Sequence, residues 1–216
     1  FFKLGYVLKN RDKSSLGFQN QVVYHDVTSF YGLNDYNADQ FSYYGNLMFQ
    51  SYISDTRHQY TTGLRYSLDK YTHQLNDTTW KRDEQVAGGF FQYTYSNFKN
   101  LNMIAGLRLD YNNLYGWLIT PRLHAKYDVN EHNVLRLSFG RGYRTANVIA
   151  ENTSVLATSK QIRFLEVPDI ESSWNFGLTY TAYIDIGNKE LTLTTDYFYT
   201  RFNNQVILDR EEDPFI

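Results

Sequence analysis

Apolar and polar residues alternate along much of this chain, most regularly over residues 101–144. In one run, Leu107 and Leu109 alternate with Arg108 and Asp110. A period of two is the signature of a strand with one apolar and one polar face. Each regular run is about ten residues long, the length that a tilted strand needs to cross a bilayer. The pattern therefore predicts an all-β fold of antiparallel, membrane-crossing strands.

Further alternating runs flank this stretch. The predicted strands cover residues 2–8, 16–31, 41–53, 60–68, 87–95, 101–111, 119–128, 134–140, 174–184 and 191–209, the last ending near Asp209. Short turns are predicted near residues 54–56, 97–99, 131 and 186–188, and long loops over 32–39, 69–84 and 145–172, with a loop of intermediate length near Asn113. Short turns on one side and long loops on the other are typical of an outer-membrane barrel, whose short turns lie in the periplasm.

The charged residues decide which face of each strand points into the barrel. An Arg or Lys that faces lipid at mid-bilayer costs about 2–4 kcal/mol. The polar faces carry Arg65, Arg108, Asp110, Arg122, His124, Lys126 and Arg136, so we predict that these residues line the lumen. No backbone group can stay unpaired in hydrocarbon, so the sheet must close. We expect residues 1–216 to be part of one larger barrel domain.

Composition and charge support this interpretation. The chain has 20 Tyr, 15 Phe and 3 Trp among 216 residues, and membrane barrels concentrate such aromatics at both interfaces. A mean hydropathy of -0.53, without a long apolar run, excludes a helical membrane protein. The net charge of -2 gives no electrostatic basis for binding nucleic acid. The absence of Cys excludes a disulfide framework and thiolate metal sites.

Other interpretations fit fewer of these features. Strands of a soluble sandwich usually have about five or six residues. A membrane-embedded hydrolase using Asp110 or His124 is the enzyme alternative, but no nucleophile elbow or P-loop is visible. The histidines are scattered, so we predict no metal or other cofactor. The spacing of Asp35, Asn37 and Asp39 resembles the start of a calcium loop, but it lacks the glycine and the final glutamate, which favours a solvated loop.

Several segments carry a family resemblance. GLRLDYNNLYG, TPRLHAKYDV, LRLSFGRGYRTANVIAEN and TDYFYTRFNNQVILD, between about Asn100 and Asp209, resemble the barrel of TonB-dependent outer-membrane receptors, especially those of Bacteroidetes-type bacteria. The most specific combination is a Pro-Arg strand, a short turn and an ascending strand that ends in Arg-Gly-Tyr-Arg.

The resemblance implies a barrel of the 22-strand class whose lumen is filled by a plug domain. Residues 1–216 contain no match to that plug, which we expect elsewhere in the full-length protein. Such receptors sit in the bacterial outer membrane, contact its lipid, and import a scarce nutrient when the TonB energy-coupling complex acts on the plug. The implied ligand is an iron–siderophore, haem or a cobalamin-like molecule. A passive porin or structural barrel is the alternative without a plug.

Binding residues concentrate in long outer loops on a rigid frame. The candidates there are Tyr71, Trp80, Lys81, Arg82, Tyr115, Trp117, Arg141, Tyr143, Arg144, Asn147, Glu151 and Asn152. Aromatic rings with arginines suit an anionic or flat ligand. The structural alternative is that Tyr115 and Trp117 belong to the interfacial aromatic girdle, and that Arg141 and Arg144 brace the base of a loop or the plug.

Overall fold

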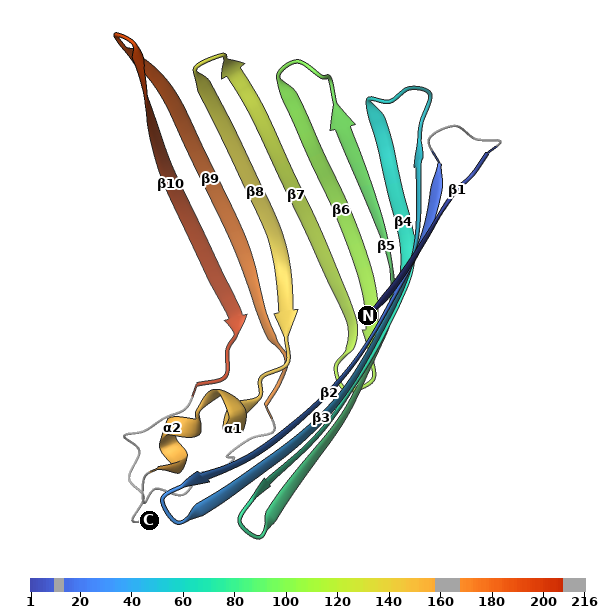
Figure 1. Cartoon of the computed structure of the whole chain (residues 1–216), viewed down its shortest axis with the longest axis vertical. Coiled ribbons are helices and arrows are strands. Elements are labelled where there is room, and N and C mark those ends of the chain that lie inside the picture. Colours follow the sequence, from blue (N-terminus) through green and yellow to red (C-terminus); the bar gives the residue numbers. More distant parts are fainter. Residues whose placement is uncertain (10–13, 158–167, 208–216) are drawn as a thin grey trace.

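The computed structural model describes residues 1–9, 14–157 and 168–207, and in this part of the chain ten strands form one antiparallel sheet. The strands follow one another in chain order, so every neighbouring pair is a hairpin or its equivalent (Figure 1). Their bounds are β1 Phe2–Val7, β2 Ser15–Tyr31, β3 Asn34–Tyr52, β4 His58–Leu75, β5 Thr78–Ser96, β6 Leu101–Asn112, β7 Gly116–Asn130, β8 Asn133–Arg144, β9 Glu171–Ile186 and β10 Lys189–Asn204. Two short helices, α1 Val148–Glu151 and α2 Thr153–Leu156, lie between β8 and β9. The predicted all-β antiparallel fold is confirmed.

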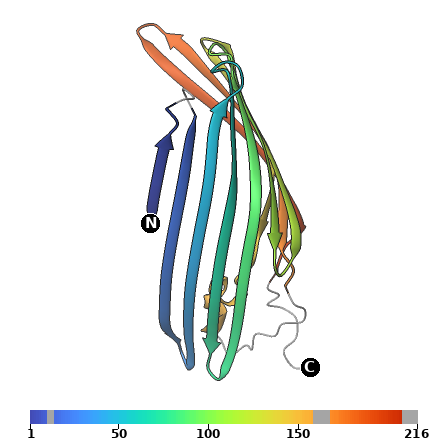
Figure 2. The ribbon, with the colours of Figure 1, turned by 90° about the vertical axis from the view of Figure 1, so that its right-hand side faces the viewer.

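The sheet curves strongly but stays open within this chain. β1 and β10 are its two edges and do not pair with each other. Both views show the curvature, with α1 and α2 near the lower ends of β2–β5 (Figures 1 and 2). No helix among the described residues is long and apolar enough to cross a membrane. An open, curved sheet with this strand order is the form expected of one section of a larger barrel wall.

Two of the predicted long loops are wrong. Residues 32–39 and 69–84 belong to strands, and only two-residue turns, Gly32-Leu33 and Asn76-Asp77, separate the strands there. Gly32 and Asn76 have positive φ values of 65° and 50°, the conformation that such tight turns require. As a result β2–β5 have 17 to 19 residues, longer than any strand of β6–β10. The asymmetry between the two ends of the barrel is therefore made by strand length.

Smaller differences concern the last two strands. β9 begins at Glu171, three residues before the predicted start at Trp174, and the segment before it contains α1 and α2 and is not wholly irregular. β10 ends at Asn204, short of the predicted end, while Asp209 lies outside the described residues. The ladder between β7 and β8 ends at the pair Arg122–Gly140, one residue from Pro121, which fits a residue without a backbone N–H.

The two faces of the sheet have opposite polarity. On the convex side, apolar side chains form a surface that we call the outer band: Phe41, Leu47, Leu64, Phe91, Leu107, Leu109, Ile119, Phe139, Leu193 and Tyr197, all exposed in the isolated chain. The residues between them, such as Arg65, Arg108 and Arg122, lie on the concave side. Because lipid tolerates the first set and not the second, the convex face is the lipid face.

The polarity reverses where β2–β5 run beyond the band. We call residues 26–40 and 69–86 the rim extension. Its convex positions include Asp26, Asp39 and Lys70, whereas its concave positions include Tyr36 and Trp80. A carboxylate or ammonium on the convex face cannot lie in hydrocarbon, so the rim extension stands in water.

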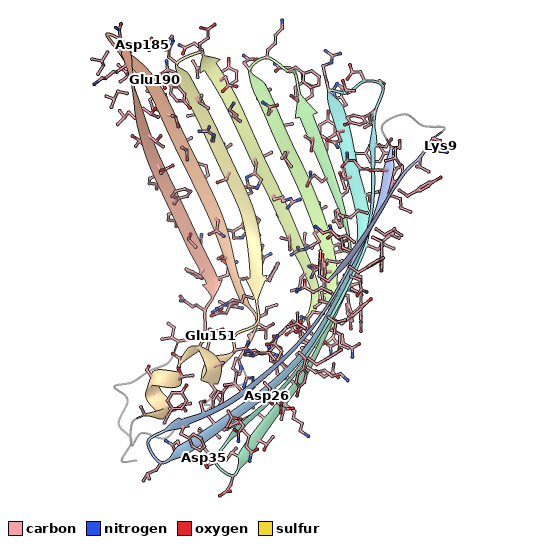
Figure 3. The ribbon with its side chains drawn as sticks, in the orientation of Figure 1. Lys9, Asp26, Asp35, Glu151, Asp185 and Glu190 are labelled. Atoms are coloured by element: carbon pink, nitrogen blue, oxygen red, sulfur yellow. The ribbon has the colours of Figure 1, made fainter. Side chains whose placement is uncertain are left out.

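Charged residues also mark the two ends of the sheet. Asp35 lies at the tip of the rim extension, while Asp185 and Glu190 flank the tight β9–β10 turn at the opposite end (Figure 3). At that opposite end all connections are short, including residues 53–57 and 131–132, whereas the long connection between β8 and β9 lies at the end of the rim extension. By the layout of outer-membrane barrels, the end with only short connections is periplasmic and the end with the rim extension is extracellular.

Candidate functional site

The concave face of the rim extension is covered by the segment that follows β8. Ile149 and Leu156, from α1 and α2, pack with Tyr36 of β3 into a buried cluster, which Leu75 and Trp80 flank. Tyr36 and Leu156 are only 3% and 2% exposed. Asn34 Nδ2 donates a hydrogen bond of 2.7 Å to the Leu156 carbonyl oxygen. The segment thus crosses from β8 to β3 and β4 on the inner side of the wall.

Arg82 stands at the centre of this region. Strand alternation places it on the concave face of β5, directly across from Tyr71 of β4. Its guanidinium carbon lies 4.5 Å from the centre of the Tyr71 ring, a cation–π contact. Arg82 Nη1 also donates a hydrogen bond of 3.2 Å to the Ala146 carbonyl oxygen, and Arg82 Nε lies 3.5 Å from Glu84 Oε2.

Glu84 ties three elements together. Its Oε1 accepts hydrogen bonds of 2.8 Å from Asn112 Nδ2 of β6 and from the Thr145 hydroxyl, at the start of the covering segment. Asn112 is 1% exposed, so this amide is part of the buried frame. Burial and the nearby Glu84 charge raise the pKa of Tyr115, in the β6–β7 turn, because both disfavour the phenolate. The frame is therefore polar, connected and charged.

A cleft of about 160 Å³ opens between β4–β5 and the covering segment. His73, Trp80 and Arg82 line one side of it, and Asn147 and Ile149 line the other. The His73 ring is stacked on Tyr71, with centroids 5.9 Å apart, and His73 Nδ1 is 2.9 Å from the Tyr36 hydroxyl. Aromatic faces, a guanidinium and amides thus converge on one small space, an arrangement that suits a ring-bearing anion.

Arg144 fixes the start of the covering segment. Arg144 Nη2 lies 3.1 Å from a carboxylate oxygen of Glu151 and 2.6 Å from one of Glu171. Glu151 lies at α1 beside the concave face (Figure 3). Asn152 Nδ2 donates a hydrogen bond to the Val148 carbonyl oxygen 2.8 Å away, within the segment itself. Arg144 and Asn152 therefore hold the covering segment in place through contacts with β9 and within the segment.

The predicted lumen residues lie deeper on the concave face. Asp110, 2% exposed, has carboxylate oxygens 3.1 Å from Arg65 Nε and 2.8 Å from Arg108 Nε. Gly88 of β5 leaves the space that the Asp110 carboxylate occupies. The Asp110 carboxylate therefore connects the guanidiniums of Arg65 on β4 and Arg108 on β6.

The remaining lumen residues line the wall of β6–β9. Arg122 Nη2 donates a hydrogen bond to the Gln92 side chain, and Arg136 Nη1 donates one of 3.2 Å to the Thr181 hydroxyl. His124 and Arg136 line a second, wider cleft of about 340 Å³. Its walls are neutral or basic, since Lys126 is the other charged residue there.

Three candidate ligand residues lie on the convex face instead. Trp117 is 67% exposed beside Tyr111, with ring centroids 5.3 Å apart in an edge-on contact. Arg141 and Tyr143 share the face of Phe139 and stack together, with 4.6 Å from the guanidinium carbon to the Tyr143 ring. The structure therefore brings together Trp80, Arg82 and Asn147 around one cleft and keeps Trp117, Arg141 and Tyr143 away from it.

Sequence reasoning did not single out Tyr36, His73 and Glu84 for this region. His73 lies two residues after Tyr71, and Glu84 lies two after Arg82, so alternation along a strand would have placed each pair on one face. The prediction of a loop over residues 69–84 excluded that inference. Asp35, Asn37 and Asp39 alternate along β3, so their side chains share one face of an extended strand and do not converge as in a calcium loop. Within residues 1–9, 14–157 and 168–207, no group of three or more His, Asp or Glu side chains is arranged to hold a metal ion.

Comparisons with known proteins agree with this architecture. A family model described as TonB dependent receptor-like, beta-barrel matches residues 1–215. The fold is similar to the siderophore receptor PirA from Pseudomonas aeruginosa, with a TM-score of 0.58 and 15% identity over 90% of this chain and 40% of that one. It also matches a variant of the ferric enterobactin receptor PfeA from Pseudomonas aeruginosa, with a TM-score of 0.48 and 13% identity over 89% and 35% of the two chains.

The PirA from Acinetobacter baumannii matches with a TM-score of 0.46 and 10% identity, over 89% of this chain and 41% of that one. The chain thus spans 35% to 41% of the length of these three receptors. A search of curated protein sequences found no match.

Proposed function

This chain belongs to the family of TonB-dependent receptor β-barrels, and we propose that it forms part of a receptor that imports an iron–siderophore complex by TonB-coupled transport. Family membership supports a role in a bacterial outer-membrane receptor and transporter, which sets aside the hydrolase alternative. The ligand and the coupling to TonB are the proposed steps. Residues 1–215 match the barrel alone, so the proposal assigns the plug to another part of the full-length protein.

The observation that supports the ligand class best is the cleft around Arg82. It combines a guanidinium 4.5 Å from the Tyr71 ring with Trp80 and His73, and it opens toward the concave side at the extracellular end. Iron–siderophore complexes that carry aromatic chelating groups are anionic and rigid. Cation–π contact, ring stacking and charge-assisted hydrogen bonds are the interactions that recognise such a molecule. Haem and cobalamin-like ligands share part of this chemistry and are the alternatives to test.

The role that we propose for each candidate residue depends on its position on the concave face. We assign first contact to Trp80, Arg82 and Asn147, with Tyr71 as the support that orients the guanidinium. Arg144, Glu151 and Asn152 hold the covering segment in place, so their effect on binding would be indirect. Arg65, Arg108, Asp110, Arg122, His124 and Arg136 form the deeper wall, which in this proposal faces the plug.

The test uses the full-length receptor in its outer membrane, with iron-loaded siderophores, haem and cobalamin as probes. Arg82→Gln should weaken siderophore binding about tenfold, because a charge-assisted bond and a cation–π contact are both lost. Lys70→Gln is the matched control, since Lys70 neighbours Tyr71 in β4 but lies on the opposite face, beside Asp83 at 3.5 Å. Equal binding by the Arg82 variant and the parent would contradict the assigned site.

Transport is tested separately. Uptake that stops when the proton gradient is collapsed supports coupling to TonB, whereas uptake that continues in proportion to the external concentration indicates a passive porin. Tight binding of haem or cobalamin in place of a siderophore would keep the receptor and change the ligand.

A further inference from the structure

The convex face carries two arginines where the outer band ends on β8–β10. On β8 the outward residues run Leu135, Leu137, Phe139 and then Arg141. On β10 the outward residues run through Leu193 and Tyr197 to Arg201. The register places Trp174 of β9 directly between the two, paired with Arg141 on one side and with Arg201 on the other.

Aromatic rings hold Arg141 flat against the sheet. Its guanidinium carbon is 4.6 Å from the centre of the Tyr143 ring and 5.5 Å from that of Trp174. Trp174 in turn stacks on Phe139, with centroids 5.2 Å apart. A guanidinium that stacks on rings still has its N–H groups free to donate in the ring plane. Arg141 is thus oriented for an anion before any anion binds.

Neither arginine has a carboxylate partner among the residues that the structure describes. The buried Nε of Arg141 also has no hydrogen-bond partner in this part of the chain. On the concave face, by contrast, Arg65 and Arg108 share Asp110, and Arg144 has two carboxylates. Even the convex Lys70 of the rim extension lies 3.5 Å from Asp83. Among the described residues, Arg141 and Arg201 are thus two neighbouring cations of the convex face that no carboxylate compensates.

Their depth decides which anion they can meet. An Arg on the lipid face costs about 2–4 kcal/mol at the bilayer midplane but only about 0–1 kcal/mol near the interface. Arg141 lies three positions before the end of β8 at Arg144, and Arg201 lies three before the end of β10 at Asn204, both at the extracellular end. Because the cost of an outward Arg is lowest at the interface, this position favours the level of the lipid headgroups in the outer leaflet for both side chains. The anions at that level are the phosphates of the lipid.

We propose that Arg141, Trp174 and Arg201 form a binding site for a phosphorylated lipid of the outer leaflet. The two arginines stand on strands separated by one other strand, so their backbones are about 10 Å apart. Side chains of that length reach a single phosphate from both sides, or two phosphates on one headgroup. The acyl chains then lie along the outer band, over Phe139 and Phe176, while Trp174 takes the interfacial position that its ring favours. The site depends on the outer-membrane location and not on which nutrient the receptor imports.

The test is lipid retention by the full-length receptor. The protein is extracted from outer membranes in mild detergent, and bound lipid is counted by native mass spectrometry, then titrated with lipid A that carries or lacks its phosphates. We expect lipid A with phosphates to bind at least tenfold more tightly than the dephosphorylated form. The variant with both Arg141→Gln and Arg201→Gln should lose this preference, while Lys70→Gln, the control on the same convex face, should keep it.

Two results would overturn the site. One is equal affinity of the parent protein for both lipids, which needs no variant and so decides the matter even if the double variant fails to assemble. The other is an assembled double variant that retains the phosphate preference. Replacement by lysine, Arg141→Lys, should give an intermediate affinity, because the charge remains while the planar stacking on Tyr143 and Trp174 is lost.

Discussion

β3–β5 run without a break from their membrane-crossing part into the rim extension, but apolar and charged residues occupy opposite faces in the two parts. In the crossing part, Leu64 and Phe91 face outward and Arg65 faces inward. In the rim extension, Lys70 faces outward, while Tyr36 and Trp80 face inward against α1 and α2. The hydrogen-bond ladder does not change between the two parts; the surroundings do. The polarity of a strand face therefore depends on its surroundings. Lipid borders the convex face in the crossing part, whereas α1 and α2 cover the concave face of the rim extension.

The largest effect is expected when a charged residue and an apolar residue exchange faces in the crossing part. Leu107 and Arg108 are neighbours in β6, and Leu107 is 53% exposed on the outer band. Leu107→Arg should cost about 2–4 kcal/mol, because the guanidinium then faces lipid. Arg108→Leu should be tolerated, since Asp110 keeps Arg65 as a partner at 3.1 Å. The yield of folded protein in lipid vesicles, measured against urea, compares the two variants.

Similar losses in the two variants would mean that the faces are assigned wrongly. A loss confined to Arg108→Leu would have the same consequence, because the lumen would then be the less tolerant side.

The packing of the inner wall predicts a smaller effect. A Cβ at Gly88 would lie 1.9 Å from Asp110 Oδ1 and 2.7 Å from the Leu109 carbonyl oxygen. Gly88→Ala should therefore displace the carboxylate from its two arginines and destabilise the barrel by about 1–3 kcal/mol. Gly142→Ala is the matched control, because a Cβ there meets nothing within 4 Å. The urea midpoint of unfolding from detergent micelles should fall for the first variant and stay within error for the second.

The sequence predicts the strands of the crossing part and their two faces, but not the strands of the rim extension, and one physical reason explains both outcomes. Lipid on one side and a polar lumen on the other impose strict alternation, and this pattern predicts the faces of Leu107 and Arg108 correctly. In the rim extension the phase of the pattern inverts near Phe41, so a strand looked like a polar loop. The inversion depends on Ile149 and Leu156, which follow Tyr36 by more than a hundred residues and cannot be placed beside it from local pattern.

For the candidate site, the sequence predicts the residue types but not how they come together. Trp80, Arg82 and Asn147 were named as ligand candidates because of their residue types, and they do line one cleft. Their convergence could not be foreseen, because it depends on where the segment after β8 folds. The outward direction of Arg141 and Tyr143, in contrast, follows from the sequence, because they lie two and four residues after the outward Phe139 in the same strand. The strand predicted over residues 134–140 ends one residue before Arg141, whereas β8 continues to Arg144.

The tip of the rim extension predicts the smallest effect and tests whether that region is a separate unit of stability. Asn76 has a φ of 50°, its Oδ1 accepts a hydrogen bond of 2.9 Å from the Asp35 N–H, and its Nδ2 donates one of 2.9 Å to Asn34 Oδ1. Asn76→Ala loses both bonds and disfavours the left-handed conformation, at a cost of about 1 kcal/mol. Asn76→Gly loses the bonds but keeps the conformation, so it separates the two causes.

We expect faster amide hydrogen exchange in residues 34–40 and 69–75 and unchanged folding yields, because the crossing part has its own lipid-facing band. A fall in the urea midpoint of unfolding for Asn76→Ala as large as that for Gly88→Ala would show instead that the two parts of these strands form together.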